Sequence, residues 1–136
     1  MDDAPFVDEE LEPNPDLNRI TNAVIGAAIA VHRELGPGYF ESVYENALAI
    51  EFHNRGIEFQ RQVMFPVLYD GQLVGEGKLD FLIEKQLIVE LKAVDSLSSI
   101  HTAQVIAYLK ATNCRLALLI NFNVRKLVDG VKRVAK

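Results

Sequence analysis

The chain has 136 residues, a formal net charge of −5 and one cysteine. This length is typical of a single domain with one hydrophobic core. A hydrophobic fraction of 49% and a charged fraction of 24% are ordinary for a globular protein and exclude a disordered chain. The lone cysteine excludes an internal disulfide framework and most cysteine-based zinc sites.

The negative charge is concentrated at the N-terminus. Residues 1–16 contain seven acidic and no basic side chains, which leaves 14 bases against 12 acids in the remainder. Residues 101–136 contain seven bases and a single acid, Asp129. A basic C-terminal third is compatible with binding to phosphates, and a solvated helix face is the alternative explanation.

The first residues differ from the rest of the chain. Residues 1–15 are rich in acids and contain three prolines, so we expect a mobile tail here and a folded domain over residues 16–136. The acidic start is unlike a secretion signal, and no apolar run reaches the roughly 18 residues needed to cross a bilayer. The sequence therefore predicts a cytoplasmic protein without a membrane partner.

The first part of the domain is predicted to be helical. Apolar residues recur at spacings of three and four from Leu17 onward, with Asp16 or Asn18 as the expected cap. The helix should end at the Gly-Pro-Gly sequence of residues 36–38, because glycine takes left-handed backbone angles and proline cannot continue the helix. A second helix is expected from about residue 40 to residue 55.

Strands are predicted in the middle of the chain. Two of them should flank Asp70-Gly71, a dipeptide typical of hairpin turns, and a second hairpin should follow over residues 78–94. A helix over residues 99–111 and a strand over residues 115–122 complete a candidate β-α-β crossover. A basic helix from about residue 125 is expected to end the chain. This order predicts an α/β or α+β domain on a mixed sheet.

The hairpin of residues 78–94 carries charges where a buried strand should be apolar. If its strands pair about the middle of their loop, Asp80 faces Glu90 and Lys78 faces Lys92. The odd-numbered side chains are all apolar and should face the core, so the charged side chains should share the other face. A bulge could shift the pairing, but it would leave the alternation within each strand unchanged.

Two carboxylates that face each other across a sheet repel, so Asp80 and Glu90 need a compensating charge. Lys92, a shared proton or a bound cation could supply it. Mg²⁺ binds convergent carboxylates and keeps positions open for water, and a nearby lysine can assist the attacking water or offset phosphate charge. The sequence therefore predicts a magnesium site, with a simple surface ion cluster as the alternative.

The pattern Asp80 … Glu90-Leu91-Lys92 resembles the core motif of the PD-(D/E)XK nuclease superfamily. The segment GYFESVY, residues 38–44, is similar to the G-x-x-E-x-x-Y signature of the bacterial GxxExxY family within it. The resemblance implies a single-domain, restriction-endonuclease-like α/β fold with a mixed β-sheet flanked by α-helices. It also implies a metal ion held by Asp80, Glu90 and the backbone carbonyl of Leu91, with Lys92 as the catalytic lysine.

Gln104 and Tyr108 resemble a further Q-x-x-x-Y motif found in one branch of the superfamily. The two residues are four apart on a predicted helix and share one of its faces. The resemblance implies that Gln104 holds a water or a phosphate in catalysis and that Tyr108 contacts the substrate. A partly buried packing face is the alternative for this pair.

Glu41 and Tyr44 belong to the G-x-x-E-x-x-Y segment and share a helix face. Members of the superfamily often supply an acid from an early helix, so Glu41 is expected as a third metal ligand and catalytic acid. A favourable interaction with the helix dipole is the alternative for Glu41. Tyr44 is expected either to contact the substrate or to pack in the core. His101 and Lys78 complete the expected substrate contacts.

These observations predict a nuclease that depends on Mg²⁺, or on Mn²⁺ in its place, and that acts on nucleic acid, with DNA preferred. The basic residues beyond position 101 are expected to contact the nucleic-acid backbone. The alternative is a catalytically silent module that binds nucleic acid or a protein partner. A homodimer and a larger defence or repair complex are both compatible with the sequence.

Overall fold

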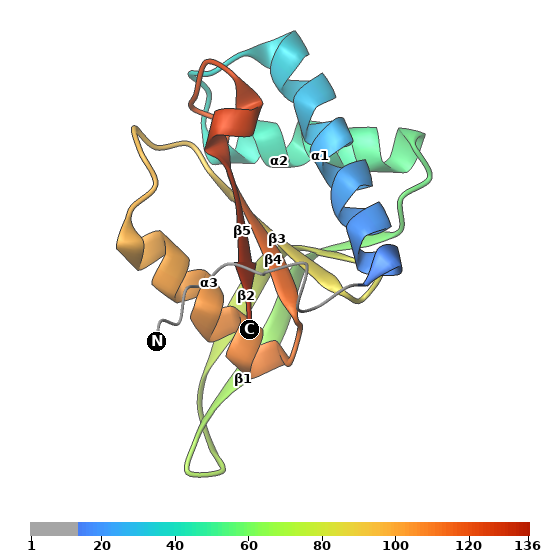
Figure 1. The fold of residues 1–136 in the computed structure, drawn as a ribbon. Helices are drawn as coiled ribbons and strands as arrows, with labels where there is room; N and C mark the ends of the chain where they lie inside the picture. Colours follow the sequence, from blue (N-terminus) through green and yellow to red (C-terminus); the bar gives the residue numbers. More distant parts are fainter. Residues whose placement is uncertain (1–13) are drawn as a thin grey trace.

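The structure is a computed structural model that describes residues 14–136 (Figure 1), so the expected acidic tail lies outside the described residues except for positions 14 and 15. One five-stranded sheet is flanked by helices, which is the α/β architecture implied by the resemblance. In chain order the elements are α1 (Pro15–Leu35), α2 (Glu41–Asn54), β1 (Phe59–Tyr69), β2 (Gln72–Ile83), β3 (Leu87–Lys92), α3 (Ser99–Thr112), β4 (Leu116–Asn121), the 3-10 helix η1 (Leu127–Gly130) and β5 (Val131–Ala135).

The helix α1 begins earlier than the sequence pattern predicted. Asn14 is the N-cap, and its side-chain oxygen accepts a hydrogen bond from the Leu17 N–H at 3.0 Å. Pro15 occupies the first helical position, where its missing N–H costs no hydrogen bond. The expected caps, Asp16 and Asn18, are therefore wrong, because both residues lie inside the helix.

The predicted boundaries around α2 and the first hairpin are confirmed. Gly36 ends α1 with a φ angle of 69°, and α2 ends at Asn54. The turn between β1 and β2 has positive φ angles at both central residues, 53° at Asp70 and 75° at Gly71. Two successive left-handed residues give the turn that matches the twist of a hairpin.

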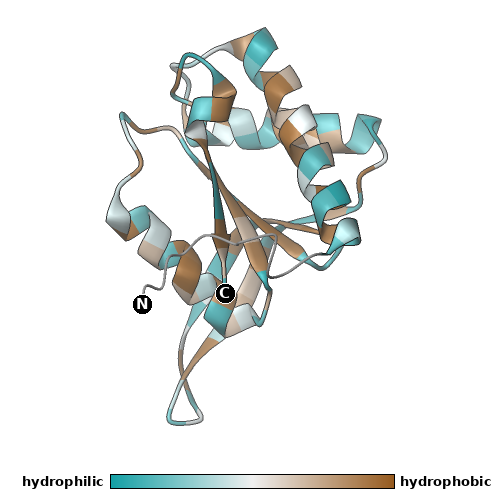
Figure 2. Ribbon diagram, in the orientation of Figure 1, coloured by the Kyte–Doolittle hydropathy of each residue, from teal (hydrophilic) through white to brown (hydrophobic). Residues whose placement is uncertain are grey.

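The sheet has the strand order β1-β2-β3-β4-β5. The strands β3 and β4 are parallel and all other neighbours are antiparallel, so the predicted β-α-β crossover through α3 is confirmed. The helices α1 and α2 pack on one face and α3 packs on the other (Figure 1). The central strands are mostly hydrophobic in Figure 2, as expected for a sheet that is covered on both faces.

The prediction of a basic C-terminal helix is wrong. Only the four residues of η1 are helical, and β5 then pairs with β4 at the edge of the sheet. Valine favours strands, and β4 offers an unpaired edge to this valine-containing segment. Gly130 permits the tight turn into β5, because a Cβ atom there would lie 2.2 Å from the carbonyl oxygen of Asn121.

This correction also changes where the C-terminal bases lie. Successive residues of a strand point to opposite faces of the sheet. Lys132 accordingly donates a hydrogen bond to Thr102 of α3 at 2.9 Å, and Arg133 donates one to Asn18 of α1 at 3.3 Å. The basic residues of the last third therefore do not form one continuous face.

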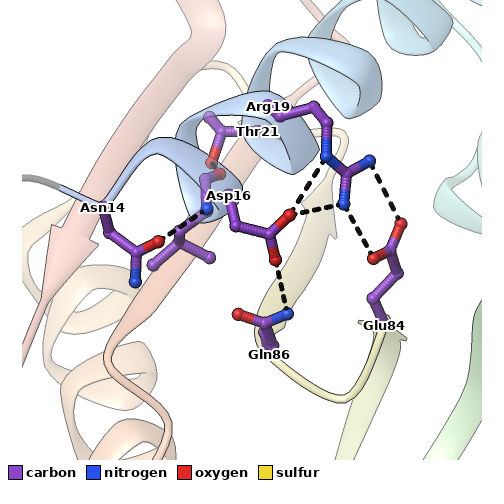
Figure 3. Close-up of polar contacts among 7 residues, drawn as sticks. Asn14, Asp16, Arg19, Thr21, Glu84 and Gln86 are labelled. Atoms are coloured by element: carbon purple, nitrogen blue, oxygen red, sulfur yellow. Dashed lines mark hydrogen bonds and ion pairs between the residues drawn. The ribbon is translucent and has the colours of Figure 1, made fainter.

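The turn between β2 and β3 is attached to α1 (Figure 3). Arg19 of α1 forms ion pairs with Asp16 at 2.8 Å and with Glu84 of the turn at 3.0 Å. Gln86 donates a further hydrogen bond to Asp16 at 3.1 Å. Exposed ion pairs are individually weak, but together these contacts link the closed end of the β2–β3 hairpin to α1.

The side-chain alternation of β2 breaks at Asp80. Phe81 packs in the core beneath α1 and α2, whereas Leu79 packs in the second core beneath α3. The expectation that every odd-numbered side chain shares one face is therefore wrong for Leu79. At the same level of β1, Gln62 has a left-handed φ angle of 52° and lies between Arg61 and Val63, the register partners of Phe81 and Leu79.

No helix within residues 14–136 is long and apolar enough to cross a membrane.

Candidate active site

The strands β2 and β3 pair with the predicted register, but only near their turn. The backbone ladder stops before it reaches Asp80 and Glu90. The register pairs are Phe81↔Val89, Leu82↔Ile88 and Ile83↔Leu87.

Where the backbone ladder stops, hydrogen bonds between side chains and the opposite backbone connect the two strands. The Asp80 N–H donates a hydrogen bond to Oε2 of Glu90 at 2.7 Å, and the Leu91 N–H donates one to Oδ2 of Asp80 at 2.8 Å. Each carboxylate thus binds a backbone N–H of the opposite strand. This exchange holds the two carboxylates in the opening between the strands, a geometry that strand alternation alone did not predict.

Both carboxyl groups lie in a poorly hydrated environment. Glu90 is 5% exposed and Asp80 is half-buried. Burial, followed by the negative charge of Asp80, raises the pKa of Glu90 to about 8. Burial also raises the pKa of Asp80, and the charges of Glu45 and Glu41 act in the same direction. The pair therefore favours added positive charge.

Lys92 ends β3 two residues after Glu90. Its positive charge lowers the pKa of both carboxyl groups, but by less than burial raises them. Within residues 14–136, the Lys92 ammonium group forms no ion pair with the carboxylate of Asp80 or of Glu90. Its ammonium group is therefore available to a water molecule or a phosphate.

Lys92 opens onto a pocket beside the first turn of α3. His101 and Gln104 line this pocket with it, together with two apolar residues of the same helix. The His101 ring is held in place because its Nδ1 accepts a hydrogen bond from the Ser98 N–H at 3.0 Å. The structure thus brings Lys92, at the end of β3, together with His101 and Gln104 of α3.

Tyr108 approaches the carboxylates from the α3 side, one turn after Gln104. Burial, followed by the negative charges of Glu90 and Asp80, raises the pKa of its phenol. Its ring packs edge-on against Phe65 of β1, with 5.1 Å between the ring centroids. Tyr108 therefore lies within electrostatic range of the acidic pair.

The helix α2 contributes two glutamates from the other side. The charges of both Glu41 and Glu45 raise the pKa of Asp80, which places them near the carboxylate pair. Glu45 was missed in the sequence, although its spacing of four from Glu41 puts the two on one helix face. Arg61 and Gln62 of β1 donate hydrogen bonds to Glu45 at 2.9 and 2.8 Å and hold it there.

Tyr44 does not reach the candidate site. Its side chain is fully buried and stacks on Phe122 with 4.6 Å between the ring centroids. Its hydroxyl donates to the Gly36 carbonyl at 2.6 Å and accepts from the Tyr39 N–H at 3.2 Å. A fully buried side chain cannot touch a substrate, so the packing alternative applies to Tyr44.

Lys78 does not share the pocket of Lys92. It is exposed and pairs with Met64 of β1. The expected pairing with Lys92 is wrong, because the ladder between β2 and β3 ends at Phe81.

The carboxylate pair fits a small, hard divalent cation. Asp80 and Glu90 each use one oxygen to bind a backbone N–H, which leaves a second oxygen for a ligand. Among the side chains described, no group of three or more His, Cys, Asp and Glu could hold a metal ion, so Glu41 does not complete the expected set of three acids. Mg²⁺ is commonly bound by one or two carboxylates, with water and substrate oxygens in its other positions.

The sequence of residues 18–134 matches the family model of the PD-(D/E)XK nuclease superfamily. The chain belongs to this superfamily. Members of the PD-(D/E)XK superfamily are generally metal-dependent nucleases, which typically use divalent ions such as Mg²⁺ and act on nucleic acid. A comparison with curated proteins gives no match to this chain.

Proposed function

We propose that this PD-(D/E)XK protein is a Mg²⁺-dependent nuclease that hydrolyses phosphodiester bonds, with DNA as its preferred substrate. The supporting observation is the carboxylate pair of Asp80 and Glu90, buried in the opening between β2 and β3 beside Lys92. Two buried carboxylates destabilise each other unless a proton or a metal ion neutralises part of their charge, so the pair favours metal binding once both groups are ionised. We also propose that the chain belongs to the narrower GxxExxY family and acts in the cytoplasm, where a lone free thiol is typical.

Asp80, Glu90 and the backbone carbonyl of Leu91 would hold the metal ion. When bound, Mg²⁺ or Mn²⁺ supplies a Lewis acid that lowers the pKa of a water molecule and stabilises negative charge on the phosphate. Glu41, whose charge raises the pKa of both carboxyl groups, would act on this centre through a water molecule rather than as a third direct ligand.

The remaining residues would position the reactants. Lys92 donates hydrogen bonds to the attacking water or to a phosphoryl oxygen, and its charge offsets the negative charge that develops there. Gln104, which lines the same pocket from α3, orients the water or the phosphate. His101 and Tyr108 contact the substrate beside the scissile bond. Binding energy spent on this orientation lowers the barrier to hydrolysis.

A cleavage assay tests the proposed function. Labelled single-stranded, duplex and branched DNA and RNA are incubated with Mg²⁺ or Mn²⁺, using wild type, Lys92→Ala and, as a matched control, Lys110→Ala on the exposed side of α3. We expect cleavage that needs metal, falls by roughly 10²- to 10⁴-fold in Lys92→Ala and is unchanged in Lys110→Ala. A folded wild type that cuts none of these substrates would favour the silent binding module instead.

A further inference from the structure

A basic pocket lies beyond the end of β4, apart from the carboxylate pair. Its charged lining consists of Arg33 from α1 and of Arg125 and Lys126 from the segment between β4 and η1. His32 and apolar residues of α1 and η1 form the rest of the wall, and no acidic side chain from residues 14–136 takes part. The pocket has a volume of about 280 Å³, which is ample for a phosphate group.

The charges in this pocket are not compensated by the rest of the described chain. Within residues 14–136, no ion pair or side-chain hydrogen bond engages Arg33, Arg125 or Lys126. Lys132, by contrast, already donates to Thr102. Three unpaired cations around one hollow create a positive potential that favours an anionic ligand.

The segment that carries two of these cations is fixed to the fold. Nε2 of His32 donates a hydrogen bond to the Val124 carbonyl oxygen at 2.7 Å. The Asn121 side chain accepts hydrogen bonds from the N–H groups of Asn123 and Val94, both at 3.1 Å. A ligand would therefore meet a pocket whose backbone is already ordered, which lowers the entropy cost of binding.

The pocket lies at the same end of the parallel strands β3 and β4 as the proposed catalytic lysine, Lys92. Asn121 is the register partner of Lys92 in the parallel β3–β4 pair, and the Phe122 N–H donates to the Lys92 carbonyl at 2.9 Å. Arg125 and Lys126 follow Asn121 closely in the chain. Figure 1 shows η1 and the start of α2 at this end of the sheet.

We infer that the pocket of Arg33, Arg125 and Lys126 binds a backbone phosphate of the nucleic acid, at some distance along the strand from the bond that is cut. This inference rests on the nucleic-acid substrate of the proposed function. Arginine presents a planar fork of N–H donors that matches phosphate oxygens, and such contacts fix the position of a strand without reading its sequence. DNA and RNA share this phosphodiester chemistry.

Binding of labelled single strands tests the inference. A DNA 20-mer of mixed sequence and its RNA counterpart are titrated in EDTA over a range of salt concentrations, so that binding is measured without cleavage. Arg125→Gln/Lys126→Gln is compared with the control Lys85→Gln/Lys110→Gln, which removes the same charge from exposed positions elsewhere. We expect the pocket variant to bind roughly tenfold more weakly, and its plot of log affinity against log salt to be shallower by about 1.4, the change that two lost phosphate contacts give on a single strand.

The control variant should change affinity and salt slope by much less. Equal losses in the two variants would overturn the inference, because net charge alone would then explain them, and so would unchanged binding in the pocket variant. A loss for only one of the two probes would support the pocket and identify its preferred polymer. Pocket-dependent binding by a wild type that cuts nothing would contradict the proposed nuclease activity and leave this inference standing. Normal cleavage with no effect of the pocket variant on binding would overturn the inference alone.

Discussion

At the scale of single residues, burial decides what the acidic side chains can do. The facing positions of Asp80 and Glu90 followed from the sequence by counting from the hairpin loop. Their exchange of hydrogen bonds with the opposite backbone did not, because it requires the strands to separate at that point. The separation places both carboxylates in a dry opening, and the raised pKa of Glu90 is its electrostatic consequence.

The metal-free protein should lose stability as the pH rises. The pKa of Glu90 is raised in the folded state from the ordinary 4.5 to about 8, so the folded state binds more protons than the unfolded state between these values. The free energy of unfolding is therefore highest at the acidic end of this window and falls toward its upper end. Urea unfolding in EDTA at a series of pH values measures this dependence.

Glu90→Gln is the matched variant for that measurement, because it keeps the shape of the side chain and removes its titration. Its free energy of unfolding should vary less with pH over the same window. Parallel pH dependence in wild type and Glu90→Gln would show that Glu90 is not the titrating group.

Tyr44 offers a test that separates packing from substrate contact. Tyr44→Phe keeps the stacked ring but leaves the Gly36 carbonyl without its donor. We expect a loss of about 1 to 2 kcal/mol in unfolding free energy and an unchanged KM of the folded enzyme. Thermal unfolding together with steady-state cleavage measures both quantities. A raised KM with unaltered stability would contradict the packing role and indicate that Tyr44 contacts the substrate.

At the scale of elements, the sequence predicted the parts that depend on local pattern. The glycine-based ends of α1 and of the β1–β2 turn, and the crossover through α3, follow from backbone chemistry and apolar periodicity. The C-terminal strand was mistaken for a helix because Leu127, Val131 and Val134 also have helical spacing. The segment forms a strand because its backbone pairs with the free edge of β4, and that edge exists only once the sheet has formed.

The change of face between Phe81 and Leu79 was equally hidden from the sequence. It occurs beside a left-handed residue that is neither Gly nor Asn, Gln62, whose side chain donates a hydrogen bond to Glu45 of α2. With this change of face, the strands β1 and β2 contribute to both cores. Glu45 escaped notice for the same reason, since its neighbours come from a distant strand.

The β1–β2 pair supplies a prediction about how α3 is supported. A Cβ atom on Gly77 would lie 2.1 Å from the Phe65 ring, which packs against Tyr108. Gly77→Ala should therefore displace Phe65 and lower the unfolding free energy by about 1 to 3 kcal/mol. Gly75→Ala, in the same strand but with nothing within 4 Å of its added methyl group, is the control. Chemical denaturation of the two variants should separate them, and equal stabilities would contradict this packing.

At the scale of the whole molecule, the candidate site joins the two helical layers through the sheet. Glu41 and Glu45 approach from α2 on one face, and Tyr108 approaches from α3 on the other. The carboxylates lie between them, where β2 and β3 separate. The membership of the superfamily could be anticipated from a short motif, but the approach of α2 and α3 to that motif could only be seen in three dimensions.

The most direct test of this account is the effect of metal on stability. The melting temperatures of wild type, Asp80→Asn and the control Asp70→Asn, in the exposed β1–β2 turn, are compared with and without Mg²⁺ or Mn²⁺. At a metal concentration of about 100 times Kd, binding adds roughly 2.7 kcal/mol to the free energy of unfolding, so the melting temperatures of wild type and the control should rise. The melting temperature of Asp80→Asn should stay almost unchanged. The same gain in Asp80→Asn, or no gain in wild type, would contradict a metal site at the carboxylate pair.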